Sequence, residues 1–211
     1  MKRTNDIEAF AVQIPDSLEN MQLPSPELLT MYKNYEERVL WLDCEISYSS
    51  LEAERMILQW NREDKGLPVE KRKPIKLLIF SLGGDLSVYD SIADVISLSK
   101  TKVIGINMGI AASAACCIFL SCHERLTLPN SRFLLHRGSV DGLSGTYAEI
   151  VSAIDDYQEQ IERLCDAIIN KTKIKKEDID EKMQSDWYLS AEEAVKYGLC
   201  SKIVDDIDDI L

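Results

Sequence analysis

Ile75–Leu120 reads IKLLIFSLGGDLSVYDSIADVISLSKTKVIGINMGIAASAACCIFL, and it is the most informative part of the chain. It opens on the apolar run Ile75–Phe80, interrupted only by Lys76, which is typical of a strand buried on both faces. Gly83-Gly84 ends the run at a sharp turn. Val88–Leu98 then carries apolar residues at helical spacing, so this first half predicts a buried strand followed by a helix.

The same order recurs in the second half of the stretch. Val103–Ile106 predicts another buried strand, and Ala111–Leu120 predicts another apolar helix. Strands that alternate with helices indicate an α/β fold. Because the strand–helix unit repeats, we expect stacked β-β-α units rather than a regular doubly wound sheet.

Further helices and strands are predicted on both sides of this stretch. A long amphipathic helix is predicted at 147–170, and Ser190-Ala191-Glu192-Glu193 forms a capping box that opens a helix ended by Gly198. The remaining predicted elements are strands at 38–42, 126–128, 133–135 and 203–204 and helices at 50–60 and 178–184. The polar segment 61–74 predicts a surface loop.

The 211 residues suffice for one large domain. Prolines punctuate residues 1–35, which we interpret as an N-terminal arm, extended or partly mobile, leading into a single domain at 36–211. No segment approaches the about 18 uncharged apolar residues of a membrane span, and the first residues lack the apolar run of a secretory signal. We therefore expect a cytoplasmic protein with no membrane partner.

Charge and cysteine content exclude several function classes. The net charge of −12 argues against a nucleic-acid partner, because phosphate binding needs clustered Lys and Arg. Six cysteines without a CxxC pair predict reduced thiols in a cytosolic chain. Cys122-His123 is the one close Cys/His couple, and adjacent side chains point apart, so we expect no metal site.

Two histidines limit the choice of a general base. His123 lies in a charged turn and is expected to be an exposed surface residue. His136 directly follows the apolar strand Phe133-Leu134-Leu135, so its ring leaves the core at a strand end. A structural role for His136 remains open on this segment alone.

Ser113 is the candidate nucleophile. It follows a buried strand and opens an apolar helix, where free N–H groups and the helix dipole favour a developing oxyanion. Its neighbours are small, although the segment lacks the G-x-S-x-G pattern. Gly83-Gly84 would let the backbone expose another N–H. A packed helix-start serine and an ordinary glycine turn are the alternatives.

An acidic residue would be needed to orient the histidine. Asp186 precedes Trp187-Tyr188-Leu189 and would be held against an aromatic cluster. Four other residues compete for the role on sequence grounds, namely Asp85, Asp90, Asp94 and Asp141.

Four segments together resemble the signature of the Clp protease proteolytic subunit. They are Ser81-Leu82-Gly83-Gly84, Met108-Gly109-Ile110-Ala111-Ala112-Ser113, Leu128-Pro129-Asn130-Ser131-Arg132-Phe133-Leu134-Leu135-His136 and the segment from Asp186 to Leu199, which reads DWYLSAEEAVKYGL. The similarity spans roughly Val39 to Val204. It implies a crotonase-like α/β fold of stacked β-β-α units with a long handle helix, in agreement with the pattern above.

The resemblance also implies a mechanism. Carried over by position, Ser113 is the nucleophile, His136 the general base and Asp186 the residue that orients it, with the backbone N–H groups of Gly84 and Ala114 as the oxyanion hole. No metal or cofactor is implied. The expected function is that of a serine endopeptidase acting on unfolded polypeptides.

The family assembly gives expectations about partners. The helix at 147–170 and the segment before it would form the handle through which two heptameric rings stack into a tetradecamer. An ATP-dependent AAA+ unfoldase would feed the enclosed chamber, since this chain has no phosphate-binding P-loop.

Several positions depart from the family pattern. Arg137-Gly138 follows the histidine where Gln-Pro is usual, Ala115 stands two places after the serine in place of glycine, and Asp43 also replaces a frequent glycine. The family's glycine-rich stretch after the first strand is replaced by Gly84-Asp85-Leu86-Ser87-Val88-Tyr89, and the loop 61–74 is longer than typical. These departures indicate a divergent member, phage-encoded or a secondary paralogue.

Three other functions fit parts of the sequence. A catalytically silent ring subunit would generally have lost Ser113, His136 or Asp186. An acyl-CoA hydratase or isomerase would use the glycine pair for a thioester oxyanion and leave the serine and histidine without a role. A Ser/Lys dyad peptidase would need a well-placed lysine, and such enzymes usually carry a membrane anchor.

Overall fold

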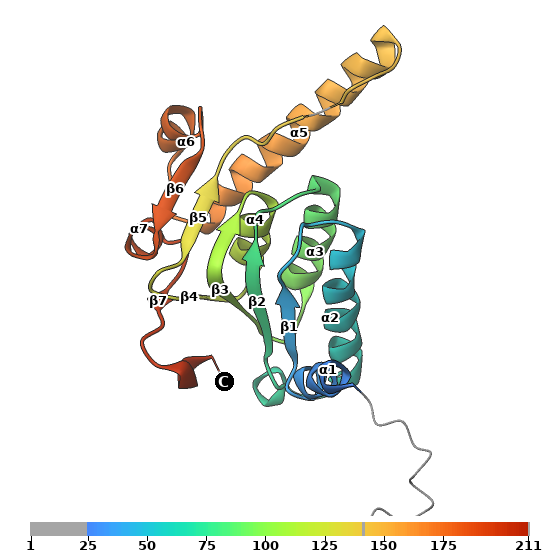
Figure 1. The fold of residues 1–211 in the computed structure, drawn as a ribbon, viewed down its shortest axis with the longest axis vertical. Helices are drawn as coiled ribbons and strands as arrows, with labels where there is room; N and C mark the ends of the chain where they lie inside the picture. The colour runs from blue at the N-terminus through green and yellow to red at the C-terminus, as the bar shows by residue number, and fades with distance from the viewer. Residues whose placement is uncertain (1–24, 141, 211) are drawn as a thin grey trace, which may run out of the picture.

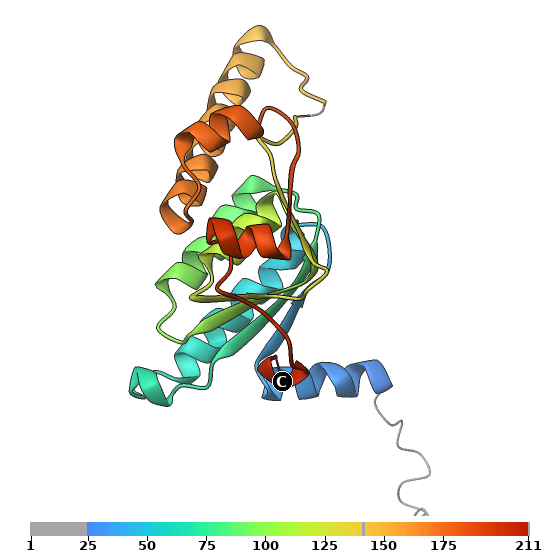
Figure 2. The same ribbon diagram turned by 90° about the vertical axis from the view of Figure 1, so that its left-hand side faces the viewer.

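The computed structural model describes residues 25–140 and 142–210. A mixed sheet packs against a layer of helices (Figures 1 and 2). The strands are β1 (Val39–Leu42), β2 (Ile75–Ser81), β3 (Val103–Ala112), β4 (Glu124–Thr127), β5 (Arg132–Leu135), β6 (Trp187–Ser190) and β7 (Lys202–Ile203). The helices are α1 (Pro26–Glu36), α2 (Leu51–Glu63), α3 (Leu86–Leu98), α4 (Ala114–Ser121), α5 (Tyr147–Lys171), α6 (Lys176–Lys182) and α7 (Ala191–Tyr197). Short 3-10 turns lie at Tyr48–Ser50, Val69–Lys71 and Ile207–Asp209.

The sheet has the order β1-β2-β3-β4-β7, with every neighbouring pair parallel. β5 adds a parallel pairing to the far end of β3, and β6 pairs antiparallel with β5. Helices α2, α3 and α4 cover one face and supply much of the main core, and all eight residues of α4 are buried. The predicted α/β fold with a long helix is confirmed.

On its side away from β2, strand β3 pairs with two different strands along its length. Ile104–Asn107 pairs with β4, whereas Ile110–Ala112 pairs with β5. Buried Asn107 sits at the switch, where its Nδ2 donates to the Arg132 carbonyl at 2.9 Å and its Oδ1 accepts from the Gly109 N–H at 3.1 Å. These bonds hold the start of β5 against β3, so the two strands end side by side.

The structure differs from the sequence-based expectation at the start of α4 and in the N-terminal arm. The helix expected from Ala111 begins at Ala114, and Ala111 and Ala112 are instead the last residues of β3. Small residues fit a close-packed strand as well as a helix, so their pattern does not separate the two. Residues 1–35 were interpreted as an arm, extended or partly mobile, but Pro26–Glu36 is helical rather than extended, with the Ser25 side chain accepting a hydrogen bond from Leu28 N–H. The rest of the predicted arm, residues 1–24, lies outside the described residues.

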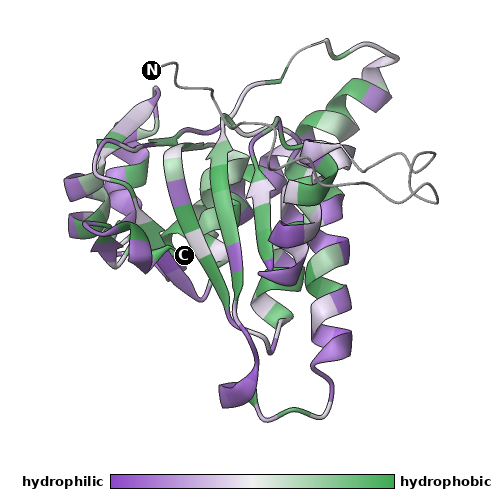
Figure 3. Ribbon diagram, turned by 60° about the horizontal axis from the view of Figure 1, so that its bottom comes forward, coloured by the Kyte–Doolittle hydropathy of each residue, from purple (hydrophilic) through white to green (hydrophobic). Residues whose placement is uncertain are grey.

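Helix α5 projects beyond the sheet (Figures 1 and 2). Its amphipathic stripe is buried only near the C-terminal end, at Leu164 and Ile168, whereas Tyr147 at the other end is 85% exposed. The colouring by hydropathy in Figure 3 shows apolar residues along this helix as well as on the central strands. Within the described residues, no helix is both long and apolar enough to cross a membrane.

A partly buried ion pair links the residue before β1 to the end of α2 and to the residues before β3. The Arg38 guanidinium donates to both Asp64 oxygens at 2.7 and 2.9 Å, and Thr101 Oγ1 donates to Asp64 at 2.8 Å. The Asp64 side chain is only 4% exposed. The hydrogen bond from Arg38 lowers the pKa of Asp64 below its usual value.

Asp64→Asn is expected to lower the free energy of unfolding at neutral pH by about 2 kcal/mol, because it leaves the Arg38 charge with only the longer 3.8 Å contact to the half-exposed Glu63 carboxylate. The folded chain binds a proton at Asp64 less readily than the unfolded chain, so the stabilisation is complete above about pH 4 and is lost as the pH falls further. Chemical denaturation from pH 3 to pH 7 measures the gap between variant and wild type, which should narrow toward the acid end.

The matched control is Glu37→Gln, which removes an exposed ion pair with Lys73 at 2.6 Å. Solvent screens this pair, so its loss should change the free energy of unfolding far less than the loss of the Asp64 carboxylate. The prediction is wrong if both variants lose the same free energy of unfolding. It is also wrong if the difference between Asp64→Asn and wild type does not change with pH.

Candidate active site

Ser113 lies at the point where β3 turns into α4. Its backbone has φ 53° and ψ −128°, and it is one of two non-glycine residues with positive φ in the described ranges. Such strain in an ordered strand–turn–helix is a feature of functional sites. The turn lifts the side chain off the strand and makes the residue the N-cap of α4, so the geometry is that of a nucleophile elbow without the usual glycines.

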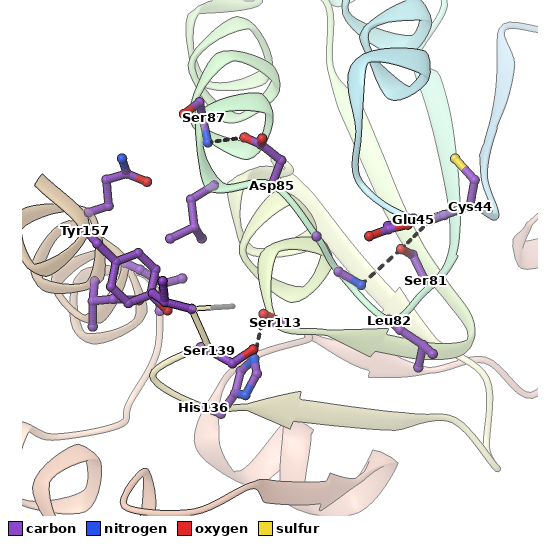
Figure 4. A pocket seen from close by; sticks show the side chains of 18 of the residues that line it. Cys44, Glu45, Ser81, Leu82, Asp85, Ser87, Ser113, His136, Ser139 and Tyr157 are labelled. Carbon is purple, nitrogen blue, oxygen red and sulfur yellow. Dashed lines mark hydrogen bonds between the residues drawn. The ribbon is translucent and has the colours of Figure 1, made fainter. Parts of the chain in front are cut away.

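His136 meets Ser113 from the neighbouring strand. It directly follows β5, whose Leu134 pairs with Ala112, and the Ser113 N–H donates to the Leu134 carbonyl at 2.9 Å. His136 Nε2 lies 2.7 Å from Ser113 Oγ, within hydrogen-bonding distance. Figure 4 shows the two side chains facing each other at the cleft.

Asp186 approaches the other nitrogen of the same ring. In the antiparallel pairing of β5 with β6, Leu135 lies opposite Trp187, so the next residues outward, His136 and Asp186, come together. Asp186 Oδ1 is 3.4 Å from His136 Nδ1, and the Asp186 side chain is 55% exposed. The competing residues Asp85, Asp90 and Asp94 form no ion pair with His136, and Asp141 lies outside the described residues.

Two backbone N–H groups border Ser113. Gly83 and Gly84 have φ of 98° and 151°, and a Cβ on Gly83 would lie 2.7 Å from Ser113 Cβ and 3.1 Å from Ala114 N. The turn is held on its other side, because Ile46 N–H donates to Gly83 O and Asp85 N–H donates to Ile46 O, each at 2.8 Å. The Gly84 N–H has no hydrogen-bond acceptor among the described residues, and Ala114 is the first residue of α4, where N–H groups have no intrahelical partner.

If the predicted oxyanion-hole role of Gly84 holds, Gly84→Ala is expected to lower kcat roughly 10²-fold, the usual effect of disturbing one oxyanion donor. An added Cβ would meet the Ile46 carbonyl oxygen at 2.3 Å, so the backbone must move and take the N–H with it. Steady-state kinetics on a peptide substrate measures the effect.

Gly66→Ala is the control for Gly84→Ala. Gly66 also has positive φ, at 96°, but a Cβ there meets nothing within 4 Å. It should change stability and leave kcat unaltered. Unchanged kcat in Gly84→Ala would exclude its N–H from the site.

The serine and histidine open into a cleft of about 860 Å³. One wall is the Gly83–Ser87 segment, and the other is the inner face of α5, with Tyr157, Ile161 and Leu164 (Figure 4). No lysine or arginine lines the cleft within the described residues. The lining combines apolar side chains with the carboxylates of Asp43, Glu45 and Asp85. A cleft of this size has room for a small molecule or a short stretch of chain.

Cys44, Ser81, Ser87 and Ser139 also line the cleft, but among these described residues only Ser113 lies within hydrogen-bonding distance of His136. The second histidine and the buried thiols lie outside the cleft. His123 is exposed, as predicted, and its Nδ1 accepts a hydrogen bond from Val103 N–H at 3.0 Å. Burial raises the pKa of the Cys117 and Cys122 thiols to about 12, so these thiols are unsuited to nucleophilic attack. Among the residues that the structure describes, no three His, Cys, Asp or Glu side chains gather as they would around a metal ion.

Sequence reasoning missed several residues that build the site. Tyr157 was given no role in the sequence analysis, yet its hydroxyl donates to the Arg137 carbonyl, directly after His136. Ser81 accepts a hydrogen bond from Gly83 N–H at 3.2 Å and supports the glycine turn. Asn107 gave a usable signal, because a polar residue in an apolar strand needs buried hydrogen-bond partners.

The fold and this site define an α/β protein of stacked strand–helix units with a serine–histidine pair at the strand ends. Residues 42–206 match the family model described as Clp protease. The chain therefore belongs to the Clp protease family.

Individual relatives agree with this assignment. The chain is 33% identical over 146 residues to the ATP-dependent Clp protease proteolytic subunit of Paracoccus denitrificans, covering 68% of this chain and 73% of the relative. It is 38% identical over 138 residues to proteolytic subunit 3 of Rhizobium johnstonii, covering 64% and 71%. Among solved structures, a ClpP1 mutant from Listeria monocytogenes superposes with a TM-score of 0.72 at 25% identity, covering 86% of this chain and 99% of that one.

Proposed function

We propose that this chain is a serine endopeptidase and the proteolytic subunit of a chambered Clp-type protease. The observation that carries the proposal is the 2.7 Å contact between Ser113 Oγ and His136 Nε2 at a strained strand–helix turn. A nucleophile within hydrogen-bonding distance of a base, beside free backbone N–H groups, is the arrangement that acyl transfer requires.

In the proposed mechanism, His136 Nε2 accepts the Ser113 hydroxyl proton while Oγ attacks the peptide carbonyl. The oxyanion that forms lies against the N–H groups of Gly84 and Ala114. His136 then returns the proton to the leaving amine, and the C–N bond breaks. A water molecule, deprotonated by the same imidazole, releases the acyl group. Asp186 holds the proton on Nδ1 and stabilises the imidazolium.

The assembly is proposed from the family and from the exposed surface of α5. Two stacked rings of this chain, heptamers by family precedent, would enclose the sites, and an AAA+ unfoldase would deliver unfolded polypeptides in the cytoplasm. Tyr147, Val151 and Ile154 lie exposed on the projecting half of α5, and contact with a second ring would cover apolar residues of this kind.

Hydrolysis of short fluorogenic peptides by the purified, assembled chain tests the activity. We expect turnover that a serine-directed fluorophosphonate abolishes and that EDTA leaves unchanged. An assembled oligomer that hydrolyses no peptide of a diverse library would contradict the proposal and favour the silent subunit. Hydration of an acyl-CoA substrate would favour the hydratase alternative.

A further inference from the structure

The residue after the catalytic histidine is tied to a helix that the proposed mechanism does not use. Arg137 Nη2 lies 2.9 Å from Asp180 Oδ1 on α6. The two side chains are 43% and 56% exposed, so solvent screens the pair and its contribution to stability is small.

Helix α6 leads directly to the other end of the His136–Asp186 contact. It ends at Lys182, and Asp186 follows four residues later, just before β6. Lys182 anchors this segment, since its Nζ lies 2.7 Å from the Tyr197 hydroxyl and 4.7 Å from the centre of the Trp187 ring. Asp180 thus stands on the same short, anchored segment as Asp186.

The backbone of Arg137 is held from a second helix. The Tyr157 hydroxyl on α5 donates to the Arg137 carbonyl at 3.2 Å. Burial raises the pKa of Tyr157, so the hydroxyl keeps its proton and remains a donor. A Cβ on Gly138 would lie 2.3 Å from the Tyr157 oxygen, so this approach depends on glycine after Arg137.

We propose that Arg137, Asp180 and Tyr157 form a clamp that positions His136 and Asp186 against each other. The inference rests on the proposed function and names positioning residues for that site. The contact between His136 Nδ1 and Asp186 Oδ1 is 3.4 Å long, and the Asp186 carboxylate is half exposed, so this contact is weak by itself. The clamp runs beside this contact, one residue beyond His136, and fixes the distance between the strand end and the α6 segment. Misplacement of about 1 Å in a catalytic group can cost roughly 10²-fold in rate, so a weak surface pair can matter for geometry.

The two histidines provide a test that does not require activity. His123 Nδ1 accepts a hydrogen bond, so the neutral ring carries its proton on Nε2. Asp186, next to Nδ1 of His136, favours the opposite tautomer there, with the proton on Nδ1. These two tautomers are the two forms that the NMR test distinguishes. We expect ¹⁵N-histidine NMR of the assembled wild-type chain to show one ring of each form. In Arg137→Ala and Asp180→Asn, His136 should shift toward a mixture of the two forms while His123 stays unchanged.

The second readout is the rate at which a fluorophosphonate labels Ser113. It should fall roughly tenfold in Arg137→Ala and in Asp180→Asn, with the labelled fraction at completion unchanged, and the double variant should be no slower than either single one. Arg137→Lys should restore most of the rate, because an ammonium group can make a single N···O contact. Arg163→Ala, which breaks a similar exposed pair with Asp90 at 3.5 Å, is the matched control and should match wild type.

A His136 ring that keeps its Nδ1 proton in both Arg137→Ala and Asp180→Asn would overturn the clamp, as would unchanged labelling rates. A wild-type chain that is not labelled, but whose His136 form changes in Arg137→Ala, would reject the peptidase proposal and retain the clamp.

Discussion

Replacement of Ser113 with alanine should lower kcat for peptide hydrolysis by roughly 10⁵- to 10⁶-fold, the loss expected when the nucleophile of a triad is removed. The physical reason is that a nucleophile needs a base beside it, and the other serine and cysteine side chains that line the cleft, those of Cys44, Ser81, Ser87 and Ser139, make no hydrogen bond to His136. Ser113 is the serine in contact with His136, and the buried thiols of α4 are held in their neutral form. Progress curves at high enzyme concentration with a fluorogenic peptide would measure the residual rate.

Ser91→Ala is the matched control for this change. Ser91 lies on α3 and its hydroxyl donates to Glu54 at 2.6 Å, away from the cleft. It should retain wild-type kcat and oligomeric state. Ser113→Ala should likewise retain the oligomer, because the lost hydroxyl removes no buried packing. Substantial turnover by a correctly assembled Ser113→Ala would reject the nucleophile assignment.

Asp186→Asn should lower kcat by roughly 10³-fold, less than the about 10⁴-fold typical of a buried triad aspartate. An asparagine keeps the shape but can donate to Nδ1, which favours the wrong tautomer of His136. The effect is smaller because Asp186 is half exposed and lies 3.4 Å from Nδ1, so water replaces part of its role. The KM should change little, since Asp186 does not line the cleft.

Asp94→Asn separates this role from a general loss of acidic charge. Asp94 is an exposed residue of α3 and was one of the competing candidates on sequence grounds. Wild-type kinetics are expected for it. If Asp94→Asn and Asp186→Asn reduce kcat equally, the orienting role of Asp186 is wrong.

The sequence was sufficient for the fold class because buried parallel strands carry runs of apolar residues, as at Leu77, Leu78 and Ile79. It was insufficient at Ala111–Ser113, where small residues suit a strand, a turn and a helix alike. Ser113, with its positive φ, lies against both β5 and the glycine turn, and neither of these is near it in the sequence.

The choice among the aspartates illustrates the same limit. His136 and Asp186 are fifty positions apart, and only the antiparallel register that places Leu135 opposite Trp187 brings them together. Likewise, the stripe on α5 predicted an amphipathic helix correctly, yet periodicity cannot say that its first half would lie exposed.

The most direct test of the account is to label the assembled chain with a serine-directed fluorophosphonate and map the adduct by mass spectrometry. Activation of Ser113 by His136 predicts one adduct, on Ser113, in the wild type and none in Ser113→Ala or His136→Ala. An adduct on another residue, or an assembled wild-type oligomer that takes up no label, would contradict it.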